Sequence, residues 1–149
     1  MQGRFFHNKR DVAGLKRAVQ LFSAAIAKDS GYARAWAGLG EAYRLLARQR
    51  GMPVAEGFSK ARAAGDRAVA LDPQLADGYE VRGHIRMDEG DWAGAKQDYL
   101  RALAIDSVHV NALSDYAQGL DWHGRSAEAI PKGRRAVELD PLSAQARNY

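Results

Sequence analysis

The chain repeats a pattern of small residues at an interval of 34 positions, and this repetition constrains its fold more than any other feature. Leu-Asp-Pro occurs at 71–73 and again at 139–141, and Ile-Asp-Ser stands midway between them at 105–107. Alanine recurs at the same interval at two positions of the repeat, and in both series the first step is longer, at 43 residues. The first series is Ala18, Ala61, Ala95 and Ala129, and the second is Ala25, Ala68, Ala102 and Ala136. A period of this length indicates one supersecondary unit built several times in succession.

Each unit is predicted to be a pair of amphipathic helices. Small and aromatic residues within a unit are separated by three or four positions, which places them on one helix face. Stretches with glycine at 88–92 (DEGDW) and 122–126 (WHGRS) indicate turns, and Asp-Pro or Asp-Ser follows each second helix. The predicted helices span 14–28, 33–47, 53–71, 75–88, 92–105, 109–122 and 126–139, and no strand pattern competes with them.

The longer step of 43 residues needs an explanation, because a loop would interrupt a stack of helix pairs. Val54 and Phe58 continue the face of Ala61 toward the N-terminus, and Pro53 precedes them. Proline is favoured at the first position of a helix. We therefore predict that Pro53 starts a helix, and that both helices of this pair are about one turn longer than the others.

The chain resembles the tetratricopeptide repeat, or TPR, in three features. These are the stretch WAGLGEAY at 36–43, the later alanines with an aromatic residue between them, and the proline at the end of a unit. The resemblance implies an all-α fold, a right-handed superhelical solenoid of antiparallel helix pairs, and a single domain over 1–149. The expected repeats are 1–32 (degenerate), 33–75 (the extended helix pair), 76–109 and 110–143, followed at 144–149 by the start of a truncated or capping helix.

The extended helix pair at 33–75 and the N-terminal stretch GRFFHNKRDVAGLKRAVQLFSAAIA resemble a narrower group of TPR proteins. These are the TPR regions that follow winged-helix DNA-binding domains or adenylate cyclase domains in bacterial signalling proteins. The resemblance implies that the chain is the sensory or partner-binding part of a larger regulator. The sequence itself contains neither a winged helix nor a cyclase metal site.

Composition excludes several classes of protein. The chain has no cysteine, so it has no disulfide framework and no thiolate ligand or nucleophile, and cytoplasmic location is the expectation. No apolar run approaches the roughly 18 residues that a membrane span needs. The net charge of +4 comes from 22 basic and 18 acidic residues that are interleaved, which disfavours nucleic acid as a partner.

The resemblance implies that the first helix of each pair lines an inner, concave groove. The groove side of these helices is predicted from their spacing to carry twelve residues: Arg34, Ala37, Glu41, Arg44, Asp77, Glu80, His84, Asp88, Asn111, Ser114, Gln118 and Trp122. A peptide or a partner helix suits such a groove. A known TPR variant clamps C-terminal carboxylates with lysine and asparagine, but the matching positions here hold Ala37, Glu41, Glu80 and His84, so that mode is not expected.

Two arginines depart from the repeat pattern. Arg82 and Arg86 stand where the repeat has a leucine and a large aromatic residue. Either their stems pack in the interface and their heads pair with carboxylates such as Asp66, with Val81 and Ile85 taking over the helix packing, or the helix is rotated.

Three functional hypotheses follow from these patterns. The first is a non-catalytic module that binds a protein or peptide in the groove, and the second is self-assembly into homo-oligomers through the terminal helices. The third is a metal protein or enzyme built on Glu80, His84 and Asp88, because His84 and Asp88 share a helix face. The sequence shows no phosphate loop, serine elbow or dinucleotide motif, so we predict no catalytic residues, no cofactor and no metal.

Overall fold

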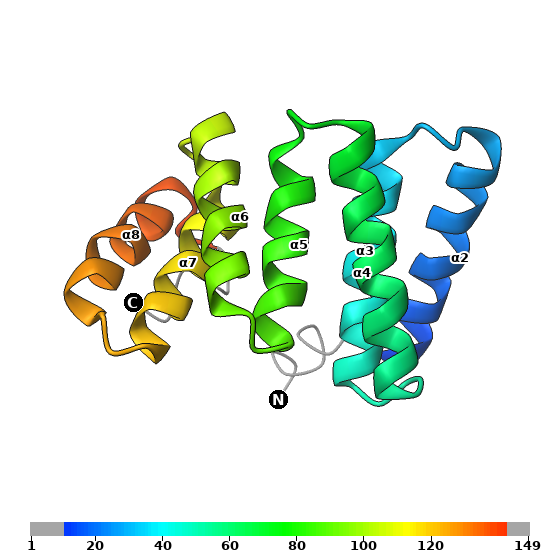
Figure 1. Cartoon of the computed structure of the whole chain (residues 1–149), viewed down its shortest axis with the longest axis horizontal. Coiled ribbons are helices and arrows are strands. Elements are labelled where there is room, and N and C mark those ends of the chain that lie inside the picture. Colours follow the sequence, from blue (N-terminus) through cyan, green and yellow to red (C-terminus); the bar gives the residue numbers. More distant parts are fainter. Residues whose placement is uncertain (1–10, 143–149) are drawn as a thin grey trace. The chain divides into compact units, whose positions relative to one another are not determined.

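The computed structural model describes residues 11–142, and these residues form seven helices without a strand. Figure 1 shows them in chain order. Every predicted helix is confirmed, with both ends within two residues of the prediction: α2 (Val12–Lys28), α3 (Ala33–Arg48), α4 (Val54–Leu71), α5 (Ala76–Asp88), α6 (Trp92–Ile105), α7 (Val110–Trp122) and α8 (Ser126–Leu139). The predicted capping helix at 144–149 lies outside the described residues.

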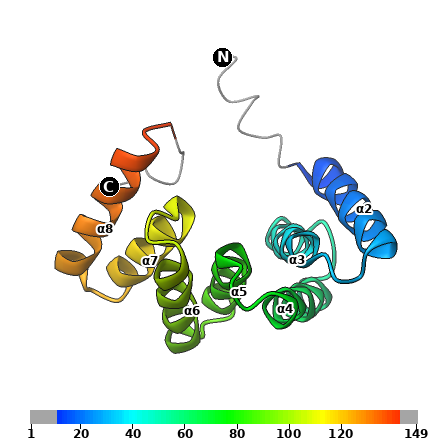
Figure 2. The same ribbon diagram turned by 90° about the horizontal axis from the view of Figure 1, so that it is seen from above.

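The helices pack as consecutive pairs, as expected for an all-α helical-repeat solenoid. The chain divides between Pro73 and Gln74 into two compact units. In the first unit α3 contacts both α2 and α4, and in the second α5 pairs with α6 and α7 pairs with α8 (Figure 2). Helix α7 also contacts α5 and α6, so it is the central helix of the second unit. The assignment of the whole chain to one domain stays a prediction.

The pair that carries the longer step is extended, as predicted. Helices α3 and α4 have 16 and 18 residues, whereas α5 and α6 have 13 and 14. Pro53 is the N-cap of α4, one residue before the helix. Its fixed φ and missing N–H suit this position, where no hydrogen bond within the helix is available.

The repeated alanines form the contact between the two helices of each pair. All six alanines of the series after residue 60 are buried, whereas Ala18 and Ala25 on α2 are only partly buried. Alanine lets two helix backbones approach closely. Gly83 of α5 shows how close, because a Cβ atom there would lie 3.3 Å from the backbone carbonyl oxygen of Ala95 on α6 and 2.9 Å from Cε1 of Tyr99. Tyr99 itself is fully buried and packs near Tyr116 of α7.

The recurring aspartate after each second helix has a structural role of its own. The side chains of Asp29, Asp106 and Asp140 each accept a hydrogen bond from the backbone N–H two residues further on, at 3.0–3.1 Å. Such an Asx turn fixes the direction of the chain as it leaves a helix. The Ile-Asp-Ser at 105–107 and the Leu-Asp-Pro at 139–141 thus share the same turn, although their last residues differ.

The two arginines that depart from the repeat pattern join α5 to α6. Arg82 donates two hydrogen bonds to Asp98, at 2.7 and 3.0 Å, and Arg86 donates a third at 2.9 Å. The Asp98 side chain is 3% exposed, while those of Arg82 and Arg86 are 20% and 30% exposed. Val81 and Ile85 are buried on the same helix. The packed alternative is therefore confirmed, with Asp98 as a shared carboxylate that the sequence reading did not name, while pairing with Asp66, which lies in the other unit, stays a prediction.

We expect Asp98→Ala to lower the free energy of unfolding by about 2–4 kcal/mol, because it removes three charge-assisted hydrogen bonds from a buried carboxylate. Glu138→Ala is the matched control. Glu138 also pairs with an arginine, Arg135, but both side chains are more than half exposed, so a loss below about 0.5 kcal/mol is expected. Urea denaturation followed by circular dichroism measures both, and equal losses would contradict the role given to Asp98.

Candidate functional site

The twelve predicted groove residues lie on the first helices α3, α5 and α7, but they differ in accessibility. Arg34, Asn111 and Trp122 are exposed. Five are partly buried: Glu41, Asp77, His84, Asp88 and Gln118. The remaining four are buried and are set aside from a binding surface: Ala37, Arg44, Glu80 and Ser114.

Arg44 is held inside the protein by its own helix. Its side chain is 2% exposed, and its guanidinium donates two hydrogen bonds to the Glu41 carboxylate one turn earlier, at 2.7 and 2.8 Å. This bidentate geometry satisfies both charges locally. An incoming partner would have to displace the pair to reach the arginine, so Arg34 is the better candidate for a basic contact on α3.

Trp122 is the most prominent accessible residue on α7. Its relative exposure is 64%, and it stands at the last position of the helix. The neighbouring His123 instead stacks on Trp92, with ring centroids 4.7 Å apart. At the end of α7, His123 therefore covers the partly buried Trp92 of α6, whereas the indole of Trp122 is accessible to solvent.

His109 links the start of α7 to α5, although the sequence offered no partner for it. Its Nε2 lies 2.7 Å from Oδ1 of Asp77, and its Nδ1 accepts the backbone N–H of Ala112, which caps the helix. These two contacts define the neutral tautomer with the proton on Nε2. The repeat period could have indicated this pair. His109 directly precedes α7, Asp77 lies in the first turn of α5, and the two helices are equivalent first helices of successive repeats.

The Asp77 contact raises the pKa of His109 above its usual value. The hydrogen bond to the carboxylate is the largest cause, burial opposes it, and the nearby charges of Glu80 and Asp106 add to it. Protonation of Nδ1 would also remove the cap on α7. The hydrogen bond from Ala112 to Nδ1 is a neutral one at 3.2 Å. The bond from Nε2 to Asp77 is shorter and charge-assisted, so it is the stronger of the two and its effect on the pKa of His109 is the larger.

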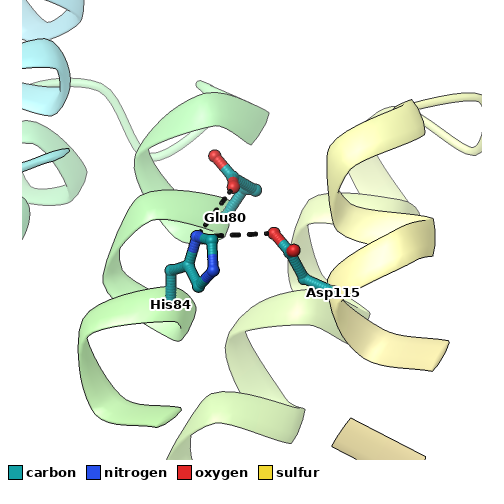
Figure 3. A group of neighbouring side chains, drawn as sticks. All are labelled: Glu80, His84 and Asp115. Atoms are coloured by element: carbon teal, nitrogen blue, oxygen red, sulfur yellow. Dashed lines mark ion pairs between the residues drawn. The ribbon is translucent and has the colours of Figure 1, made fainter. Parts of the chain in front are cut away.

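Glu80, His84 and Asp115 form a compact cluster between α5 and α7. Figure 3 shows the three side chains pointing toward one another, two from α5 and one from α7. Nδ1 of His84 lies 3.6 Å from Oε1 of Glu80 and 3.6 Å from Oδ2 of Asp115. Asp88, the third ligand in the metal hypothesis, is not in the cluster, and Asp115 takes that place. The sequence carried one signal for it: Asp115 is a carboxylate at the repeat position of buried Val81.

Among the helices of residues 11–142, none is long and apolar enough to cross a membrane.

Comparison with known proteins supports the fold and leaves the family open. No family model matches the chain, and no curated protein sequence matches it. A thermophilic TPR protein from Thermus thermophilus superposes with a TM-score of 0.80 at 22% identity, over 95% of this chain and 74% of that one. MamA gives a TM-score of 0.66 at 19% identity, over 93% of this chain and 76% of MamA.

A third similar structure is the first TPR of Spaghetti (RPAP3), solved bound to an HSP90 peptide. It gives a TM-score of 0.65 at 21% identity, over 80% of this chain and 88% of that one. Two of these three structures are described as TPR proteins, and the chain has the TPR fold.

We expect His109 to titrate above pH 6.5, the usual histidine value, and Asp77→Asn to return its pKa toward that value. Because the folded state binds the proton more tightly, the pair stabilises the protein fully below pH 6.5, and this contribution is lost as the pH rises through the folded-state pKa. NMR titration of the imidazole measures the pKa. Asp88→Asn, eleven residues along α5 from Asp77, is the control and should leave it unchanged; the same pKa in all three proteins would contradict the assignment.

Proposed function

We propose that this protein is a non-catalytic interaction module that binds a peptide or protein partner on the accessible side of its first helices. The TPR fold supports this proposal, since stacked helix pairs present extended binding surfaces. One structurally similar protein, the first TPR of Spaghetti (RPAP3), was solved with a bound peptide. The proposed contact residues are the accessible ones among those predicted: Arg34 and Glu41 in the first unit, and Asp77, His84, Asp88, Asn111, Gln118 and Trp122 in the second.

The observation that carries the proposal is the exposed indole of Trp122 on a first helix. Tryptophan dominates the binding energy of many interfaces, because it buries a large rigid surface at little cost in side-chain entropy. Asn111 and Gln118 lie on the same face of α7, at spacings of seven and four residues. This face therefore combines one apolar anchor with two neutral polar groups.

The charges of the second unit indicate the chemistry of the partner. Asp77 and Asp88 lie at the two ends of α5 and are partly accessible, although Asp77 also binds His109 through one carboxylate oxygen. A segment with basic and apolar side chains complements these acidic groups and the indole of Trp122. An acidic C-terminal tail would meet repulsion there, which agrees with the mismatch at the positions of the carboxylate clamp.

The biological setting proposed here is a bacterial regulatory or signalling protein in the cytoplasm. This part of the proposal rests on the sequence resemblance to TPR regions that follow winged-helix or adenylate cyclase domains.

Self-assembly through the terminal helices is the second candidate function. Ile130 on α8 is 45% exposed and Leu21 on α2 is 58% exposed, so each terminal helix of the described chain presents an apolar side chain. Light scattering over a hundredfold concentration range tests this function. A molar mass that rises with concentration, and that falls back in an Ile130→Glu/Leu21→Glu variant, supports it, and a constant monomer mass excludes it.

For the interaction module, we expect peptides selected from a display library to bind the wild-type protein at least tenfold more tightly than Trp122→Ala, because loss of an anchoring tryptophan costs about 2 kcal/mol or more. Arg34→Glu should weaken peptides that contact the first unit. Fluorescence anisotropy with labelled peptides measures both affinities.

The matched controls lie on second helices. Leu100→Ala removes a large side chain on α6 that is 45% exposed, and Arg67→Glu reverses an exposed charge on α4. Both should bind the selected peptides like the wild type. Equal weakening by Leu100→Ala and Trp122→Ala, or unchanged affinity in Trp122→Ala and Arg34→Glu, would remove the first helices from the binding surface.

A further inference from the structure

We propose that Glu80, His84 and Asp115 form a binding site for a divalent transition metal ion, and that Zn²⁺ is the ion this set of donors suits best. The site lies within the second unit, between α5 and α7 (Figure 3). His84 belongs both to this cluster and to the proposed peptide surface, but the two proposals rest on different observations, and neither depends on the other.

The geometry of the cluster fits a small metal ion. Tetrahedral zinc with bonds of about 2.1 Å to nitrogen and oxygen holds its ligand atoms about 3.4 Å apart. The imidazole Nδ1 stands 3.6 Å from each carboxylate, and all three donor atoms lie within 4.8 Å of one another. Small rotations of the side chains bring the three donors to coordination distance.

Burial and charge favour a cation at this point. The side chains of Glu80, His84 and Asp115 are 10%, 11% and 5% exposed. Two carboxylates and a neutral imidazole carry a formal charge of −2, which is costly to remove from water unless it is compensated. A divalent ion neutralises the group completely, whereas a proton on His84 leaves one negative charge.

Glu80 provides an independent observation that points to a ligand. Its side chain is nine-tenths buried and is directed at His84, and the contact that residues 11–142 give its carboxylate is the ion pair with His84. Its ion pair with His84 at 3.6 Å is longer than a hydrogen bond. Buried carboxylates normally accept several N–H or O–H groups or bind a metal. A bond to a metal ion would satisfy this one.

The donor set selects among metals. An imidazole nitrogen suits Zn²⁺ and its transition-metal neighbours, whereas Mg²⁺ and Ca²⁺ prefer shells made of oxygen. Three protein ligands leave the fourth position of a tetrahedral ion to water or to another donor. Because the ligands come from two helices, the bound ion would also cross-link α5 to α7.

The test is calorimetric titration of the chelator-treated full chain with Zn²⁺, with Mg²⁺ as the comparison ion. We expect binding of one Zn²⁺ per chain, a rise in the thermal unfolding midpoint, and no response to Mg²⁺. Glu80→Gln, Asp115→Asn and His84→Ala should each weaken Zn²⁺ binding by at least tenfold. Asp88→Asn, which removes a carboxylate of the same helix outside the cluster, should bind like the wild type.

Replacement of Zn²⁺ by Co²⁺ reports the geometry, because tetrahedral Co²⁺ absorbs strongly in the visible range. Circular dichroism checks that each variant is folded. If His84→Ala fails to fold, the isosteric Glu80→Gln variant still tests the site, because it removes a ligand charge without changing the shape of the side chain. Absence of Zn²⁺ binding by the wild type would overturn the proposal. Binding that survives Glu80→Gln and Asp115→Asn would place the metal elsewhere on the chain.

Discussion

The close approach of the two helices within each pair is the constraint on which the rest of the structure depends. It is made possible by residues with little or no side chain, such as Ala95 and Gly83, facing one another across the α5–α6 pair. At such a separation a single large ring, that of Tyr99, fills the remaining space. Dispersion contacts between well-packed atoms are weak individually and large in sum, so small residues at fixed intervals stabilise every pair in the same way.

The fold was predictable from the sequence because its determinants are local and repeated. The two alanines of each unit are seven residues apart, which is about two helical turns, and the units recur every 34 residues after the first longer step. A glycine turn joins α5 to α6 and α7 to α8, and an aspartate follows each second helix. Gly90 and Gly124 adopt positive φ at the turns indicated by DEGDW and WHGRS, a conformation that other residues adopt at a cost. Periodicity therefore located all helix ends to within two residues.

The candidate site was less predictable, since it depends on contacts between helices. Arg44 was predicted to line the groove from its position on the helix, but its side chain is buried, and no spacing rule shows that Glu41 holds its guanidinium away from solvent. Asp98 and Asp115 were missed because each pairs across a helix boundary, with residues 12 to 31 positions away. A charged residue at a position where the repeat requires an apolar one was the available signal; for Arg82 it was noticed, and for Asp115 it was not.

The polar contacts of α5 have a consequence for how the solenoid is assembled. Alanine faces are smooth, and two helices that meet through them alone could slide by one turn, about 5.4 Å, with little change in contact. The bidentate hydrogen bonds from Arg82 to Asp98 can form at only one axial position of α5 relative to α6. The hydrogen bond from Arg86 to Asp98 supports the same position. We infer that the alanines set the distance between α5 and α6, while the arginines set their vertical alignment. Charged groups in an otherwise apolar interface thus select one axial alignment of α5 and α6.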